Sequence, residues 1–294
     1  SPERIMVTPG ASGALLLISA LLMNPGDGML MTDPGYPCNR HFLRLVEGEG
    51  QLVPVTEASR FQLTAEIAEQ NWRSNTIGAM VASPANPTGE VLTKEQLSAL
   101  AELCEQKGGS LIVDEIYHGL NYGERASSIL EVTDNAFVIN SFSKYFLLTG
   151  WRIGWLICPD NLYSSIKNLA PNLFVAPPTI SQYVAISALD YDNYLKKIVK
   201  TYEQNMHLLY KNLPKIGFQP VIKPEGSFYL YADVSKISNN SVQLCKNLLK
   251  KYGLVLTPGT DFDSIEGNKY VRFCYSYPKK DIIKGIKKLN SIFL

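Results

Sequence analysis

Short apolar runs rich in β-branched residues alternate with longer segments of helical periodicity, and this alternation constrains the fold more than any other feature. The runs expected to form strands span residues 28–31, 50–55, 77–82, 110–113, 136–139 and 153–157. Alternation of this kind is typical of layered α/β proteins, in which helices flank a largely parallel sheet. We therefore predict an α/β fold built on such a sheet.

The segment from Thr93 to Lys107 has the clearest helical pattern between these strands. Its apolar side chains fall on one face, and Gly108 and Gly109 end it. Thr93 and Gln96 have the spacing of a capping box. We expect a helix that begins at this pair.

The character of the chain changes after a long amphipathic segment at residues 194–213. Two further strands and two Lys-rich helices are expected at residues 227–232, 270–275, 242–252 and 279–294. These elements predict a compact α+β unit. We therefore predict a large domain at 1–193 and a smaller one at 194–294, joined by the helix 194–213.

The charge balance and the apolar runs exclude several partners. The 294 residues carry 28 Lys and Arg against 27 Asp and Glu, and no block of five or more like charges occurs. Nucleic acid is therefore not an expected partner. The longest apolar run, residues 14–23, is half of the roughly 20 residues that a membrane-spanning helix needs. We expect a buried helix there and no membrane contact.

The cysteines and histidines indicate neither disulfides nor a metal site. The five cysteines are scattered and include no C-x-x-C pair, which fits a reducing cytoplasm. His41, His118 and His207 have no metal-ligand spacing, so no metal is expected. No G-x-S-x-G motif supports a serine hydrolase.

A lysine in an apolar setting, Lys144, follows an expected strand and the serines Ser141 and Ser143. Burial lowers the pKa of a lysine, and a neutral lysine can condense with a carbonyl as a Schiff base. Arg152, eight positions later, could hold a phosphate on the same carbonyl compound. The alternative interpretation is a surface loop with an ordinary Lys and Arg.

Another apolar strand ends in Asp114 and Glu115, with Tyr117 close behind. Parallel sheets gather ligand contacts at the carboxyl ends of their strands. Asp114 could keep a pyridine nitrogen protonated there, and Tyr117 could donate to an oxygen on the same ring. The alternative is a strand that simply ends in an acidic turn.

Two loops after expected strands carry candidate ring contacts. In the loop 83–89, prolines restrict the backbone, could adopt the cis form and leave the Asn86 amide free to donate and accept. Tyr36 follows Asp33-Pro34-Gly35 and could stack on a ring. An ordinary turn and a core tyrosine are the alternatives.

The first helix and the last strand supply candidate anion contacts. Gly10, Ala11 and Ser12 open directly into the apolar helix, whose free N–H groups could bind an anion, although a Ser-capped helix start is an alternative. Arg272 lies in an otherwise apolar strand. Such an arginine favours a bidentate carboxylate partner, either a substrate or a structural Asp or Glu.

All of these features occur in one order along the chain: anion loop, aromatic residue, Asn loop, Asp and Tyr, Ser-x-Ser-Lys followed by Arg, and late Arg. That order resembles the class I/II aminotransferases of pyridoxal-phosphate (PLP) fold type I. The resemblance covers essentially the whole chain, and residues 83–89, 114–117 and 144–154 carry it most specifically. It implies a mostly parallel mixed sheet, PLP as cofactor, and amino acid and 2-oxo acid substrates.

The resemblance also implies a role for each candidate. Lys144 would form the Schiff base and then move the proton at the substrate Cα. The implied cofactor contacts are Gly10, Ala11, Ser12, Tyr36, Asn86, Asp114, Tyr117, Ser141, Ser143, Lys144 and Arg152. The implied substrate contacts are Asn86 and Arg272, with Arg272 on the α-carboxylate.

By this resemblance, Asp114 would pair with the ring nitrogen of the cofactor. Asn86 and Tyr117 would hydrogen-bond the ring oxygen, and Tyr36 would stack on the ring face. The phosphate would lie among Ala11, Ser12, Ser141, Ser143 and Arg152. The family's sites lie at a subunit boundary, which implies a homodimer.

The chain departs from the family pattern at its start. The anion loop normally follows an N-terminal segment, whereas here it begins within the first ten residues, so we expect that segment to be missing. Tyr145 stands where the family often has a small hydroxyl residue. Two alternatives use the same scaffold: a PLP-dependent carbon–sulfur β-lyase and a catalytically silent PLP-binding regulatory domain.

Overall fold

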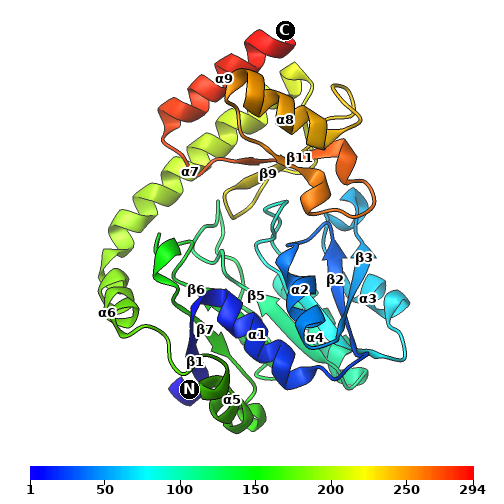
Figure 1. The fold of residues 1–294 in the computed structure, drawn as a ribbon, viewed down its shortest axis with the longest axis vertical. Helices are drawn as coiled ribbons and strands as arrows, with labels where there is room; N and C mark the ends of the chain where they lie inside the picture. The colour runs from blue at the N-terminus through cyan, green and yellow to red at the C-terminus, as the bar shows by residue number, and fades with distance from the viewer.

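A seven-stranded sheet forms the centre of the computed structural model, which describes residues 1–294 (Figure 1). Its order is β1-β7-β6-β5-β4-β2-β3. The strands are β1 (Ile5–Thr8), β2 (Gly28–Asp33), β3 (Glu49–Pro54), β4 (Thr76–Ala82), β5 (Ser110–Asp114), β6 (Ala136–Ser141) and β7 (Gly154–Ile157).

Most neighbours in this sheet are parallel: β3 with β2, β2 with β4, β4 with β5, and β5 with β6. Strand β7 runs antiparallel to both of its neighbours, β6 and β1. The predicted mostly parallel mixed sheet is therefore confirmed, and all six predicted strands are present. Strand β1 was missed because four residues, partly exposed, give too short a pattern.

Helices cover both faces of the sheet. They are α1 (Gly10–Leu22), α2 (Cys38–Leu45), α3 (Ala65–Asn71), α4 (Lys94–Gln106) and α5 (Asp160–Phe174). Successive residues of β5 alternate between two cores: Ile112 packs with α1 and α5, whereas Leu111 and Val113 pack with α3 and α4. Both faces of the strand are buried, which explains why its sequence is a continuous apolar run.

Helix α4 begins where the sequence predicts. The Thr93 hydroxyl accepts from the Gln96 N–H at 3.2 Å, and the Gln96 side chain accepts from the Thr93 N–H at 2.9 Å. The capping box is therefore confirmed.

A second, smaller sheet forms in the later part of the chain. The strands β8 (Gln219–Pro220), β9 (Tyr229–Asp233), β10 (Thr257–Pro258) and β11 (Tyr270–Cys274) are antiparallel, in the order β10-β11-β9-β8. With α8 (Ser241–Tyr252) and α9 (Lys279–Phe293) they enclose a core of their own, from Met206 to Leu289. The predicted α+β unit is thus present.

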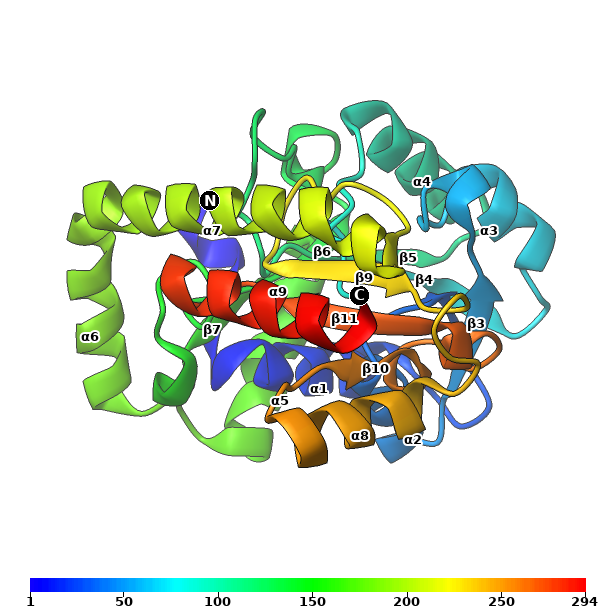
Figure 2. The same cartoon turned by 90° about the horizontal axis from the view of Figure 1, so that it is seen from above.

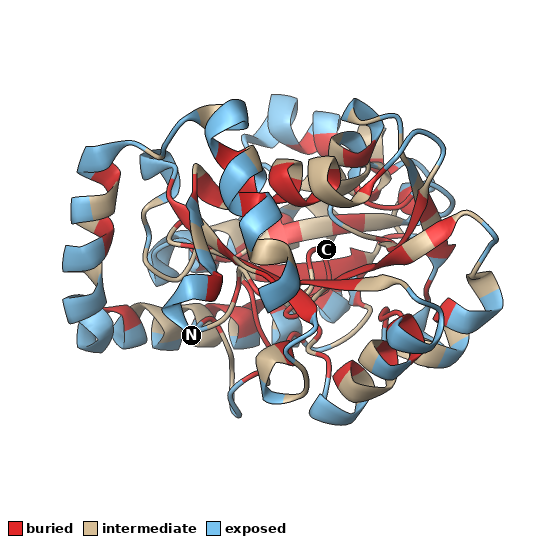
Figure 3. Cartoon of the chain, turned by 90° about the horizontal axis from the view of Figure 1, so that it is seen from below, coloured by how far each residue is buried: buried red, intermediate tan, exposed pale blue.

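Two helices connect the sheets. Helix α6 (Thr179–Ala188) leads into α7 (Asp192–Asn212), a long helix that extends from α6 to the smaller sheet and packs against α9 (Figure 2). Buried residues lie mainly on the strands and on the inner helix faces (Figure 3). The exact division at 193/194 stays a prediction. No helix combines the length and the apolar character that crossing a membrane requires.

Candidate active site

A cavity of about 280 Å³ lies at the carboxyl ends of β4 and β5, between the two sheets. Ten of the twelve predicted site residues line it: Ala11, Ser12, Tyr36, Asn86, Asp114, Tyr117, Ser143, Lys144, Arg152 and Arg272. The other two, Gly10 and Ser141, lie directly beside lining residues. Five lining residues were not predicted: Leu15, Ala82, Ile116, Thr149 and Tyr229. The fold therefore brings together residues that are 262 positions apart, from Gly10 to Arg272.

The start of α1 and Arg152 form one end of the cavity. Gly10 has a φ of +72°, and a Cβ built on it would lie 2.5 Å from Nη2 of Arg152. Only glycine lets the guanidinium lie against the helix start. The N-cap is Pro9 and makes no side-chain bond, so the Ser-capped alternative is wrong. The first N–H groups of α1 remain free beside a cation, which suits an anion.

Ser141 and Ser143 form hydrogen bonds that stabilise the turn that carries Lys144. The Ser141 hydroxyl lies 2.9 Å from the Ser143 hydroxyl and 3.0 Å from the Ile153 carbonyl, to which it can donate. Ser141 is fully buried and does not line the cavity, whereas Ser143 does. Thr149 donates to the Ser143 carbonyl at 3.0 Å. A hydroxyl residue in a loop has no pattern that could have singled out Thr149.

Lys144 reaches into the cavity from this turn. Its Nζ lies 5.9 Å from the ring centres of both Tyr117 and Phe228. Burial lowers the pKa of the amine; the Asp114 carboxylate opposes that shift, while Arg272 and Arg152 add to it. The alternative of an ordinary surface lysine is therefore wrong.

The two carboxylates at the end of β5 point to different surroundings. Asp114 lines the cavity, accepts from the Ile116 N–H at 3.0 Å, and has a pKa raised to about 6 by burial. Glu115 instead accepts from the Ser128 hydroxyl and the Ile129 N–H, both at 2.9 Å. Asp114 is therefore available to a ligand in the cavity, whereas Glu115 stabilises the neighbouring turn.

Aromatic residues form the wall and the mouth. Tyr117 is buried, with its ring edge-on to Phe228 and Tyr229 at 5.5 and 6.0 Å. Tyr36 is 42% exposed at the mouth, which leaves its ring available to a ligand. Tyr229 was expected only as a strand residue, because a tyrosine in an apolar strand has no functional signature.

Arg272 has no carboxylate partner within the protein. Its side chain donates to Asn86 Oδ1 at 2.9 Å and to the Thr257 hydroxyl at 3.4 Å, and its Nε is buried without a partner. The guanidinium carbon lies 3.8 Å from the ring centre of Tyr229 and 4.4 Å from that of Phe262. The structural Asp or Glu is therefore ruled out, and a half-buried cation faces the cavity uncompensated.

Asn86 serves Arg272 and the cavity together. Because its Oδ1 accepts from Arg272, its amide nitrogen stays available as a donor. The peptide bonds Ser83–Pro84 and Asn86–Pro87 are both cis. Because Asn86 lines the cavity and bonds Arg272, the loop is part of the site.

The chain was compared with known proteins. The model of the family "Aminotransferase class I and II" matches residues 1–289. This chain belongs to that aminotransferase family. A valine–pyruvate aminotransferase of Mycobacterium tuberculosis is 38% identical over 99% of the chain and 76% of its own length.

Solved structures agree with this assignment. An aminotransferase from Mycobacterium tuberculosis has a TM-score of 0.96 and 36% identity, covering 100% of this chain and 76% of that one. A mutant aspartate aminotransferase of Thermus thermophilus has a TM-score of 0.92 and 28% identity, covering 99% and 80%. The predicted family and fold type are confirmed.

The chain is thus a PLP-dependent aminotransferase acting on amino and 2-oxo acids. The residues present fit the cofactor. One cavity contains an anion site beside Arg152 that needs a glycine, a buried carboxylate, a lysine with a lowered pKa and an exposed aromatic ring. The named relatives are transaminases, and they give no support to the lyase or the regulatory alternative.

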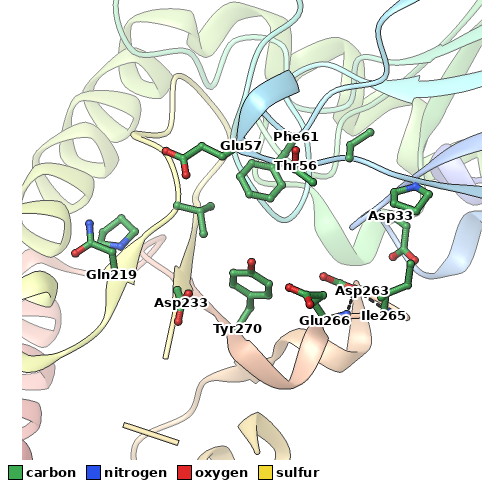
Figure 4. A pocket seen from close by; sticks show the side chains of 14 residues that line it. Asp33, Thr56, Glu57, Phe61, Gln219, Asp233, Asp263, Ile265, Glu266 and Tyr270 are labelled. Carbon is green, nitrogen blue, oxygen red and sulfur yellow. Dashed lines mark hydrogen bonds between the residues drawn. The ribbon is translucent and has the colours of Figure 1, made fainter. Parts of the chain in front are cut away.

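A larger cavity of about 490 Å³ has different chemistry (Figure 4). Its lining includes five carboxylate residues and no Lys or Arg: Asp33, Glu57, Asp233, Asp263 and Glu266. It shares no lining residue with the cavity that holds Lys144. An anionic cofactor and an anionic substrate would be repelled there, so size alone does not identify the active site of this aminotransferase.

We expect Gly10→Ala to weaken PLP binding about tenfold or more, since the methyl group must displace the Arg152 guanidinium and strain a positive φ. Titration of the cofactor-free protein with PLP, followed by absorbance, measures this. Gly150→Ala is the matched control, because a Cβ there meets nothing within 4 Å. Equal affinity of the Gly10 variant and the wild type would contradict the phosphate cradle.

Proposed function

We propose that this aminotransferase moves an amino group from a neutral aliphatic amino acid to a small 2-oxo acid. In this proposal Lys144 moves the proton and Arg272 binds the α-carboxylate. The observation that carries it is the Arg272 guanidinium, which is fixed between two rings, lacks a carboxylate and shares a cavity with Lys144. A substrate carboxylate would provide the missing charge.

The cofactor's phosphate would lie on the Ala11 and Ser12 amides, with Ser143 and Arg152 beside it. Ser141 would not contact the phosphate itself but would hold the Ser143 hydroxyl in place by a hydrogen bond. Gly10 would leave room for the Arg152 guanidinium. When bound, PLP supplies an aldehyde carbon that reacts with amines and a protonated ring that withdraws electrons.

The ring contacts would come from the strand ends. Asp114 would pair with the ring nitrogen, because it is the only carboxylate that lines the cavity and the positive charge of a protonated ring favours its ionised form. Asn86, through its free amide nitrogen, and Tyr117, through its hydroxyl, would donate to the ring oxygen. Tyr36 would cover the ring face.

Lys144 would act as the base. Its lowered pKa gives a larger neutral fraction at neutral pH than an ordinary lysine has. The neutral amine would take up the proton at the substrate Cα, and the resulting ammonium would be the proton donor for the second half of the transfer. Arg272 limits rotation of the substrate by holding its carboxylate.

The remaining residues that line the cavity favour a substrate whose side chain is neutral. The cavity holds three cations, Lys144, Arg152 and Arg272, and each already has a role. Apolar side chains, including Leu15, Ala82 and Ile116, complete the lining. A carboxylate at the end of the substrate side chain would therefore lack a partner. The 38% identical relative named for valine and pyruvate supports the same class.

A donor panel tests this function. We expect valine with pyruvate to exceed aspartate by at least about tenfold in kcat/KM. Lys144→Ala should abolish transfer. Arg272→Lys should raise the KM for the donor about 10- to 100-fold, because an ammonium cannot form the bidentate contact. Faster transfer from aspartate would overturn the substrate class, and an unchanged KM in Arg272→Lys would overturn the carboxylate site.

The lowered pKa of Lys144 predicts a pH dependence. In the cofactor-free protein, its acylation rate should rise with pH and reach half its maximum below 10.5, the ordinary value. Asp114→Asn should move that point further down, since the carboxylate raises the pKa of the lysine. Mass spectrometry of the acylated peptide measures both. A half-point at or above 10.5 would contradict the desolvated amine.

We also propose a homodimer. An apolar surface on α6 and the turn after it supports this, with Ile180, Tyr183, Ile186, Leu189 and Tyr191 each 56–66% exposed. Sedimentation at micromolar concentration should show a dimer, and Ile186→Asp should shift it toward monomer. Val255→Asp, at a 76% exposed position outside this surface, is the control. A monomeric wild type would refute the dimer.

A reducing compartment, the cytoplasm, is proposed as the site of action. All five cysteines are free thiols, and Cys104, Cys158 and Cys245 are buried as apolar side chains. Thiols in this state fit a compartment that keeps them reduced.

A further inference from the structure

The Asn86 loop contacts the turn at 224–226 directly through its backbone. The Gly89 carbonyl accepts from the N–H groups of both Glu225 and Gly226, each at 2.9 Å. A Cβ on Gly89 would lie 2.7 Å from Pro224, and one on Gly226 would lie 2.5 Å from Pro84. The two backbones are therefore in direct contact, and the loop cannot shift without moving the turn at 224–226.

The loop is also closed on itself, with Glu90 at the closure. The Ala85 N–H donates to the Glu90 carbonyl at 2.8 Å, and the Gly89 N–H donates to the Ala85 carbonyl at 2.9 Å. Asn86 lies inside this closed segment and bonds Arg272. A shift of Glu90 would therefore also shift Asn86, because these backbone bonds hold residues 85–90 together.

One arginine ties this loop to the turn. The Nε of Arg60 forms an ion pair with Glu90 Oε1, and its Nη2 lies 3.0 Å from Glu225 Oε1. The Glu90 side chain is only 2% exposed, and its second oxygen has no partner. Arg60 therefore contacts both the Asn86 loop and the turn at 224–226. It also provides the positive charge beside the buried carboxylate of Glu90.

Two features make this position costly for the chain. Arg60 has a φ of +53°, in the left-handed region that a long side chain rarely adopts. Burial raises the pKa of Glu90 to about 7, although Arg60 opposes that shift. The chain therefore keeps a left-handed residue and a buried carboxylate at one point, and loss of either partner of the ion pair would leave a buried group without its counter-charge.

We propose that Arg60 and Glu90 are positioning residues for substrate binding. Their ion pair fixes the loop 85–90, which presents Asn86 to Arg272, and thereby sets the guanidinium that receives the substrate carboxylate. This inference rests on the proposed role of Arg272. Lys144 is held by a separate turn, through Ser141 and Ser143, so the pair acts on the carboxylate site and leaves the position of Lys144 unchanged.

The experiment measures binding and turnover in the holoenzyme. The probe is 3-methylbutanoate, a carboxylate that has no amine and cannot react, titrated by calorimetry. The variants are Glu90→Gln, Arg60→Met and Arg60→Lys. Arg73→Met is the matched control, because Arg73 forms an exposed ion pair with Glu49 at 3.2 Å. KM and kcat for the donor are measured in parallel.

We expect Glu90→Gln and Arg60→Met to weaken probe binding and raise KM by about tenfold, with kcat within about threefold of the wild type. Arg60→Lys should restore part of the affinity, and Arg73→Met should match the wild type. Where Glu90→Gln does not fold, Glu225→Gln, at a half-exposed position, should weaken binding in the same direction.

Three results would overturn the inference. One is wild-type probe binding in Arg60→Met and in a folded Glu90 or Glu225 variant, while Arg272→Lys binds weakly; the proposed function would then stand. Another is a loss confined to kcat. The third is an equal loss in Arg73→Met. Unchanged probe binding in Arg272→Lys would instead refute the proposed carboxylate site itself.

Discussion

Parallel alignment of the central strands is the constraint on which the site depends. Strands β2, β4 and β5 run in the same direction, so the loops after them emerge at one edge of the sheet. These loops carry Tyr36, Asn86 and Tyr117, and Asp114 is the last residue of β5. Residues separated by dozens of positions therefore meet because the strands that precede them are neighbours in the sheet. The antiparallel strand β7 returns the chain so that Arg152, just before it, reaches the start of α1.

The charge balance of the cavity follows from this arrangement. Three cations, Lys144, Arg152 and Arg272, face a single carboxylate, Asp114. Partial burial makes this excess positive charge unfavourable in the protein alone, as the lowered pKa of Lys144 shows. A ligand that carries a phosphate and a carboxylate compensates two of the cations. This compensation removes the two arginines' lowering effect on the pKa of Lys144, so burial is what keeps the amine neutral, which is the form that a base requires.

The sequence predicted most of the sheet, because buried parallel strands are continuous apolar runs with turn residues between them. It also predicted the cavity residues that lie at strand ends or next to distinctive neighbours, such as Asn86 between prolines. It could not predict Thr149 or Tyr229, since each enters the cavity through tertiary contacts that no local pattern encodes. Glu90 and Arg60 were missed for the same reason: their pairing joins residues 30 positions apart on separate loops.

The two halves of the chain contribute unequally to the carboxylate site. Arg272 and the rings that enclose it, Tyr229 and Phe262, all come from the C-terminal half, where β9 and β11 are neighbours. Within the cavity, only Asn86 bonds this arginine from the other half. A single hydrogen bond is too weak to hold two halves in register. Several backbone contacts supply that register, among them Gly89 with Gly226, Gly35 with Phe262 and Leu120 with Ser227. The charged groups beside Gly89 constrain the loop that carries Asn86.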